Sequence, residues 1–176
     1  MVLLGQAVST AEATGTIEPT TRTRSGLARA QPQMDDPAAA LDAVTQGQEL
    51  SNPAEEPAMR MLEGLALLEL NRPEESVRAF SDAVIAADAL LALTDRNVAA
   101  LQTRAIALSR LAVSADDQTR ATEAENAFAR ADAVTDATGV TADICRLLDR
   151  IAHHDRSGIL AKVRAAKDRD DTKRAG

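Results

Sequence analysis

The chain has 176 residues, the length of one ordinary domain, and carries a formal net charge of −7. An acidic chain without a clustered basic face is not typical of nucleic-acid-binding proteins, and no apolar window approaches the length of a membrane span. Trp and Tyr are absent, Phe occurs twice and Ala is the commonest residue. Because β-branched and aromatic residues favour strands whereas Ala and Leu favour helices, this composition predicts an all-α protein.

The helical period of the apolar residues predicts eight helices and a short ninth one. In chain order we expect the eight at residues 2–13, 23–33, 37–50, 56–70, 73–92, 96–113, 117–136 and 141–153, and the short one at 156–166. Residues 14–22 are predicted to form a loop. The charged residues 167–176 are predicted to form a flexible tail beyond a single domain over residues 1–166.

Short polar motifs mark several of the predicted helix starts. Asp36 precedes a proline, which is typical of an N-cap followed by proline in the first turn. Residues 52–55 and 71–74 repeat this arrangement, although Pro57 indicates that the helix after Asn52 begins a few residues later. A capping box led by Ser114 is predicted to start the helix at 117–136.

The segment 64–84 has small and large residues at spacings that suit two closely packed helices. The pattern is a small residue, a large one three positions later, a turn, and then small-x-x-x-aromatic-x-x-small. The positions are Gly64, Leu67, Ser76, Phe80 and Ala83. This segment resembles the tetratricopeptide repeat (TPR), in which small residues allow two helices to touch and the aromatic ring fills the space between hairpins.

The second half of this pattern returns further along the chain. The later copy consists of Ala124, Phe128 and Ala131, so both Phe residues of the chain occupy one repeat position. A fainter, earlier copy consists of Ala40, Val44 and Gly47. The resemblance covers about residues 23–136. It implies a right-handed superhelical array of antiparallel helical hairpins, a TPR-like α-solenoid, with hairpins at about 23–50, 56–92 and 96–136 and capping helices over 141–166.

The resemblance also implies where a partner would bind. In TPR arrays the first helices of successive hairpins line a concave groove. The corresponding positions are Met61, Leu65, Leu68, Glu69, Gln102, Ile106, Ser109 and Arg110. The alternative is that this apolar stripe belongs to the core or to a self-association surface.

The residues most often used in catalysis do not form a recognisable site in this sequence. His153 and His154 are adjacent, so they point to different sides of a helix, and no second His or Cys cluster completes a metal site. Cys145 cannot form an internal disulfide and is predicted to be a small buried hydrophobe. Most carboxylate pairs fall at helix starts, where capping explains them. We therefore expect no catalytic residues, cofactor or metal.

The sequence thus predicts a non-enzymatic protein–protein interaction module or scaffold that binds a protein segment or its own copy, and neither nucleic acid nor membrane. The alternative is the helical-repeat portion of a larger bacterial transcriptional regulator or signalling ATPase, since the apolar helix at 2–13 resembles the second helix of a hairpin. A third, less favoured alternative is an enzyme that uses the groove for a small molecule. The lack of a signal peptide favours the cytoplasm, and the excess of Arg over Lys favours a bacterial source.

Overall fold

The computed structural model describes residues 36–48, 52–134, 138–161 and 163–165. The helices of more than ten residues in these ranges are α3 (Pro37–Gln48), α4 (Glu56–Glu69), α5 (Pro73–Leu93), α6 (Val98–Ala115), α7 (Gln118–Val134) and α8 (Thr138–Ala152). Residues 160–161 and 163–165 are also helical, and the described residues contain no strand. The all-α class is therefore confirmed for this part of the chain. The helices predicted at 2–13 and 23–33, the loop at 14–22 and the tail at 167–176 lie outside the described residues.

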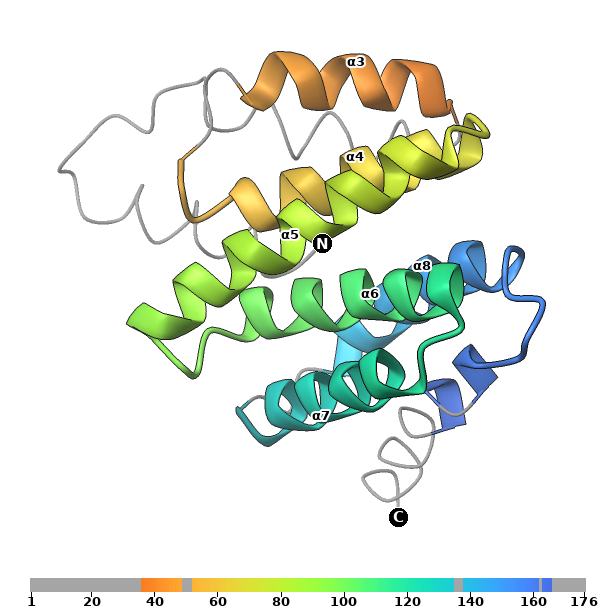
Figure 1. Cartoon of the computed structure of the whole chain (residues 1–176). Coiled ribbons are helices and arrows are strands. Elements are labelled where there is room, and N and C mark those ends of the chain that lie inside the picture. Colours follow the sequence, from red (N-terminus) through yellow and green to blue (C-terminus); the bar gives the residue numbers. More distant parts are fainter. Residues whose placement is uncertain (1–35, 49–51, 135–137, 162, 166–176) are drawn as a thin grey trace, which may run out of the picture.

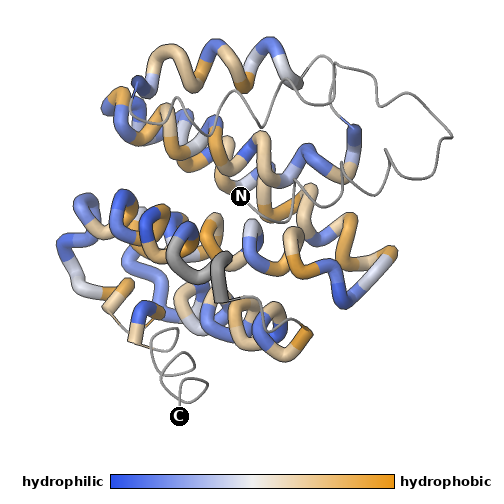
Figure 2. The backbone as a smooth tube through the Cα atoms, turned by 180° about the vertical axis from the view of Figure 1, so that it is seen from behind, coloured by the Kyte–Doolittle hydropathy of each residue, from blue (hydrophilic) through white to orange (hydrophobic). Residues whose placement is uncertain are grey.

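The helices pack largely in the order of the chain. In Figure 1, α3, α4 and α5 lie together above α6 and α7, and α8 lies behind α6. Consecutive helices from α3 to α7 contact one another, and α8 contacts α6. Hydrophilic and hydrophobic residues alternate along the helices in Figure 2, as expected for helices that bury one face. Their apolar faces meet in a cluster of buried side chains that runs from Ala40 of α3 to Val163.

Two of the predicted N-caps are confirmed or refined by the structure. Asp36 caps α3, since its Oδ1 accepts a hydrogen bond of 3.1 Å from the Ala39 N–H. The helix after Asn52 begins only at Glu56, in agreement with the delay that the second proline indicates, and Glu55 at its N-cap makes no side-chain cap hydrogen bond. Asn52 instead stabilises the preceding turn, where its Oδ1 accepts from the Ala54 N–H at 3.1 Å.

The prediction that residues 71–74 repeat an N-cap is wrong. Arg72 occupies the N-cap of α5 and makes no side-chain cap hydrogen bond. Asn71 ends α4 instead, because it adopts the left-handed conformation with φ 57°. Its N–H donates to the Leu68 carbonyl at 3.1 Å, and the Arg72 N–H donates to the Leu67 carbonyl at 2.9 Å, so the last turn of α4 is closed by backbone bonds.

The prediction that Ser114 leads a capping box is also wrong. Its hydroxyl lies inside α6 and donates to the Leu111 carbonyl at 2.8 Å. Asp117 is the residue that caps α7, since its Oδ1 accepts from the Thr119 N–H at 2.9 Å. Between them Asp116, two positions after Ser114, takes φ 51° and ends α6.

Helices α4 and α5 approach each other closely at Gly64. A Cβ atom on Gly64 would lie 2.8 Å from two ring carbons of Phe80, so no larger residue fits without movement of the ring. One turn earlier on α5, the buried Ser76 hydroxyl donates to the Gly64 carbonyl at 2.8 Å. A small residue at each of these positions is therefore required by the contact between the two helices.

Both phenylalanines are buried, as the repeat pattern predicted. Phe80 is 0% exposed and Phe128 is 3% exposed, and both belong to the same apolar cluster. Since the chain has no other aromatic side chains, these two rings are its largest apolar groups.

We expect Gly64→Ala to lower the free energy of unfolding, although Ala is the better helix former by about 1 kcal/mol. The added methyl group overlaps the buried Phe80 ring, and overpacking of this kind costs roughly 1–3 kcal/mol. Urea unfolding of Gly64→Ala, Phe80→Leu and the double variant measures the coupling. A cost for Gly64→Ala that is the same in both backgrounds would contradict this steric explanation.

We expect Phe80→Ala and Phe128→Ala each to lower the free energy of unfolding by about 3–5 kcal/mol, because each removes a buried ring and leaves a cavity. Leu93→Ala serves as a control, since that side chain is 84% exposed and its loss should change stability by less than about 0.5 kcal/mol. Urea unfolding measures all three. A phenylalanine variant that behaves like the control would refute the role of that ring in the core.

Candidate functional site

The predicted groove positions are mostly buried. Six of the eight are no more than 7% exposed, namely Met61, Leu65 and Leu68 of α4 and Ile106, Ser109 and Arg110 of α6. Glu69 and Gln102 are half-buried. The alternative interpretation of this stripe, that it belongs to the core, agrees with the burial of these six.

Part of this face is covered by the chain's own C-terminal region. Arg150 of α8 forms an ion pair with Glu69 at the end of α4. Leu148 and Ile151 of α8 are almost fully buried and join the common apolar cluster. A partner segment that binds along the end of this face would therefore have to displace α8, and the peptide groove stays a prediction.

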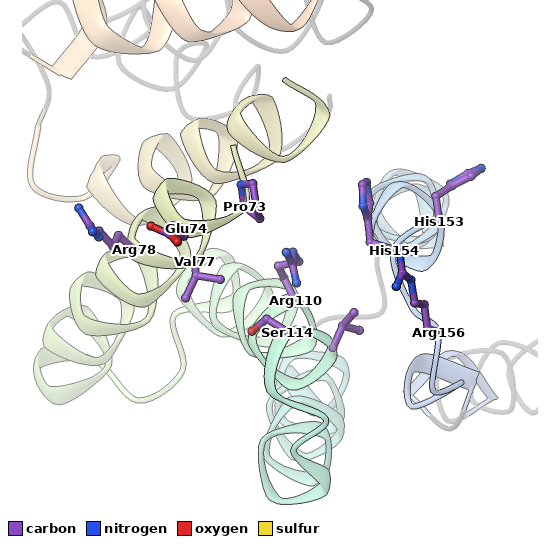
Figure 3. A pocket seen from close by; sticks show the side chains of 10 residues that line it. Pro73, Glu74, Val77, Arg78, Arg110, Ser114, His153, His154 and Arg156 are labelled. Atoms are coloured by element: carbon purple, nitrogen blue, oxygen red, sulfur yellow. The ribbon is translucent and has the colours of Figure 1, made fainter. Parts of the chain in front are cut away.

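A cavity of about 700 Å³ opens beside this covered face (Figure 3). It lies between the first turns of α5, the last turns of α6 and the residues that follow α8. The residues that line it are Pro73, Glu74, Val77, Arg78, Arg110, Val113, Ser114, His153, His154 and Arg156. It combines side chains from three parts of the chain that are far apart in the sequence.

The lining of this cavity is basic, in contrast to the acidic chain as a whole. It contains three Arg and two His residues but only one carboxylate, that of Glu74. The first turn of α5 also faces this region, and the N-terminus of a helix carries partial positive charge. The cavity therefore favours a negatively charged occupant.

Arg110 is the most unusual of these residues. It is only 5% exposed, and its Nε has no hydrogen-bond partner among the described residues. Figure 3 shows its guanidinium directed into the space between α5 and α8. Burial lowers the pKa of Arg110, but an arginine pKa is so high that the group stays charged at neutral pH.

The two adjacent histidines point to different sides of the chain, as predicted. In Figure 3 the His154 ring faces the cavity, whereas the His153 ring points away from it. The Nδ1 of His153 lies 2.8 Å from the Asp149 carbonyl oxygen. Desolvation and, after it, the charges of Arg110 and His153 lower the pKa of His154, while Glu69 acts in the opposite direction.

The turn after α8 is organised by Asp155. Its Oδ1 accepts from the Gly158 N–H at 2.9 Å, and its Oδ2 accepts from the Leu160 N–H at 2.8 Å. Desolvation acts to raise the pKa of Asp155, but the hydrogen bonds from Leu160, Ser157 and their neighbours together lower it. This carboxylate therefore has a structural role, and it fixes the path of the chain next to Arg156.

Cys145, possible metal ligands and membrane-spanning helices do not add a candidate site in the described residues. Cys145 is half-buried, so the prediction that it is a buried hydrophobe is only partly correct. Within the described ranges, no group of three or more His, Cys, Asp and Glu side chains could hold a metal ion. None of the described helices is long and apolar enough to cross a membrane.

A second candidate surface lies on the C-terminal half of α5. Ile85 is 68% exposed and Leu93 is 84% exposed, although both are large apolar side chains. Ala89 and Ala92 between them are exposed as well. We call these four residues the α5 stripe.

No protein-family model matches this chain, and neither a curated protein nor a solved structure matches it significantly. The geometry and charge of the described residues are therefore the basis for assigning these candidate surfaces.

Sequence reasoning singled out Arg110 and His154 but not their common cavity. Glu74 was predicted only as part of a helix start, and no role was predicted for Arg78 or Arg156. Each of these is an ordinary charged residue on an exposed helix turn or loop, so no local pattern distinguishes it from the other charged residues of the chain.

The lowered pKa of Asp155 predicts a pH-dependent contribution to stability. A carboxylate whose pKa is lower in the folded state stabilises the fold above its unfolded pKa, and this contribution disappears as the pH falls through the folded pKa. We expect Asp155→Asn to reduce the free energy of unfolding at pH 7 by about 1 kcal/mol, as for the loss of a helix cap.

Urea unfolding of the wild type and of Asp155→Asn at several pH values measures this contribution. The difference between the two proteins should shrink as the pH falls below the ordinary aspartate range of about 4. If the difference in the free energy of unfolding stays constant as the pH falls through and below the folded pKa, the charge of Asp155 does not stabilise the turn.

Proposed function

We propose that this chain is a non-enzymatic interaction module, a TPR-like right-handed array of helical hairpins that presents the α5 stripe to a helical segment of a partner protein. The observation that carries the proposal is the exposure of Ile85 and Leu93 on one side of a long helix. Helices that pack in chain order, with two closely paired hairpins at α4–α5 and α6–α7, support the arrangement.

The α5 stripe has the geometry of a helix-binding surface. At 100° per residue, Ile85, Ala89, Ala92 and Leu93 fall within about one third of the helix circumference. The two alanines leave shallow positions between the two larger side chains, which suit the ridge of an approaching helix. Burial of each large side chain contributes roughly 1.5–3 kcal/mol, so both are expected to act as anchors for a partner that covers them.

The charges beside the α5 stripe indicate what the partner helix carries. Asp82 and Asp88 of α5 are both exposed, and the exposed Asp95 lies two residues after the end of the helix. Arg104 pairs with Asp88 at 2.6 Å and neutralises part of this charge, but the surrounding chain is acidic overall. The complementary partner is an amphipathic helix with apolar residues on one face and Lys or Arg along its edges.

The proposal is tested with a helical peptide that has Leu residues on one face and Lys residues on the other. We expect Leu93→Glu to weaken binding at least about tenfold, because it removes an apolar contact of more than 1.4 kcal/mol. Ala129→Glu is the matched control, since it adds the same charge at an exposed position of α7. Fluorescence anisotropy gives both dissociation constants, and circular dichroism checks that both variants stay helical.

Equal binding by Leu93→Glu and Ala129→Glu would overturn this assignment, because charge alone would then govern the affinity. Sedimentation equilibrium without peptide tests the remaining occupant, a second copy of the chain. A dimer that Leu93→Glu dissociates and Ala129→Glu preserves would replace the partner helix with self-association.

A further inference from the structure

The cavity between α5, α6 and the end of α8 has a property that packing alone does not explain. Of the buried side-chain nitrogen and oxygen atoms in the described ranges, only Arg110 Nε has no hydrogen-bond partner. A buried donor left in this state costs about 1–3 kcal/mol, and more when the group is charged. The guanidinium is nevertheless held at the wall of an open cavity, where a ligand can reach it (Figure 3).

We propose that this cavity binds a small organic anion through a phosphate or carboxylate group, with Arg110 as its principal contact. The planar guanidinium presents parallel N–H donors that match the oxygens of either group. A bound oxyanion would accept hydrogen bonds from the N–H groups of Arg110 that face the cavity and would offset the charge of a side chain that is only 5% exposed. This site is separate from the α5 stripe and does not depend on it.

The neighbours of Arg110 reinforce its preference for an anion. Arg78 lines the cavity from α5, and His154 and Arg156 line it from the residues after α8. All three are exposed, so they can adjust to a ligand, whereas Arg110 is held in place by its burial. Glu74 is the one lining carboxylate, and it opposes an anion by Coulomb repulsion.

The size and walls of the cavity indicate a small molecule. A cavity volume of about 700 Å³ lies within the range of about 300–1,000 Å³ that ligand sites occupy. Val77 and Val113 form an apolar part of the lining. The ligand therefore combines an anionic group at Arg110 with a compact organic body that these valines contact.

His154 provides a direct spectroscopic readout of binding. The chain has only two histidines, so their imidazole C–H signals are resolved by NMR and assigned with His153→Gln. The charged groups around His154 are Arg110 of α6, Glu69 of α4 with its partner Arg150, and the neighbouring His153 and Arg156. An anion at Arg110 would offset the positive charges that lower the pKa of His154 and would therefore raise it.

The experiment titrates the whole chain with inorganic phosphate and, separately, with citrate at constant ionic strength. We expect saturable shifts of the His154 signal with a dissociation constant of about 1 mM or tighter, which corresponds to about −4 kcal/mol. The His154 pKa should rise on saturation. Tighter binding of phosphate or of citrate identifies which oxyanion the site prefers. No saturation by either anion would overturn the proposal.

Variants separate this site from general electrostatics. Arg110→Gln should abolish saturable binding, and Arg156→Gln, at an exposed position, should weaken it several-fold. Glu74→Gln should strengthen binding several-fold because it removes the repelling carboxylate. Glu56→Gln makes the same charge change at the distant start of α4 and should leave the affinity unchanged. Equal effects of Glu74→Gln and Glu56→Gln, or full binding by Arg156→Gln, would refute the site.

Discussion

The contact between Gly64 of α4 and Phe80 of α5 is the constraint on which much of the described structure depends. It brings the two helix backbones close enough for the Ser76 hydroxyl to reach the Gly64 carbonyl, and it encloses the ring completely. Because the chain has only two aromatic rings, closely packed small residues rather than bulky side chains must fill its interior. Alanines therefore make up much of the buried cluster, and each helix–helix contact tolerates little change in volume.

This close packing leaves the polar groups at the helix ends to determine the surface. At one end of the structure the last turns of α6, the first turns of α5 and the residues after α8 meet around Arg110, whose charge is shielded from water but faces a cavity. In the C-terminal half of α5, Ile85 and Leu93 are not covered by other helices and face the solvent. The two features differ in chemistry: the first suits an anion and the second suits an apolar helix. A small helical protein can thus offer two independent recognition surfaces.

Local sequence signals predicted the described helices well. The boundaries of α4 and α5 differ from those predicted by one residue at most, because Pro57 and Pro73 fix where each helix can start. The N-caps were less predictable: Asn71 and Ser114 have the right side chains for a cap, yet one ends a helix and the other lies inside one. In both cases the position of a left-handed residue decides which polar side chain can reach the free N–H groups, and sequence alone does not give that conformation.

Composition, periodicity and spacing along one or two helices were enough to predict the helical class, the boundaries of α4 and α5 and the burial of both Phe residues. Which faces remain open depends instead on contacts between helices that are distant in the sequence. The proposed groove positions on α4 and α6 became largely buried, in part because α8 pairs Arg150 with Glu69 and covers them. The cavity at Arg110 and the exposed α5 stripe likewise arise from how separate helices end and overlap. Such arrangements depend on contacts between residues far apart in the chain, which no local pattern encodes.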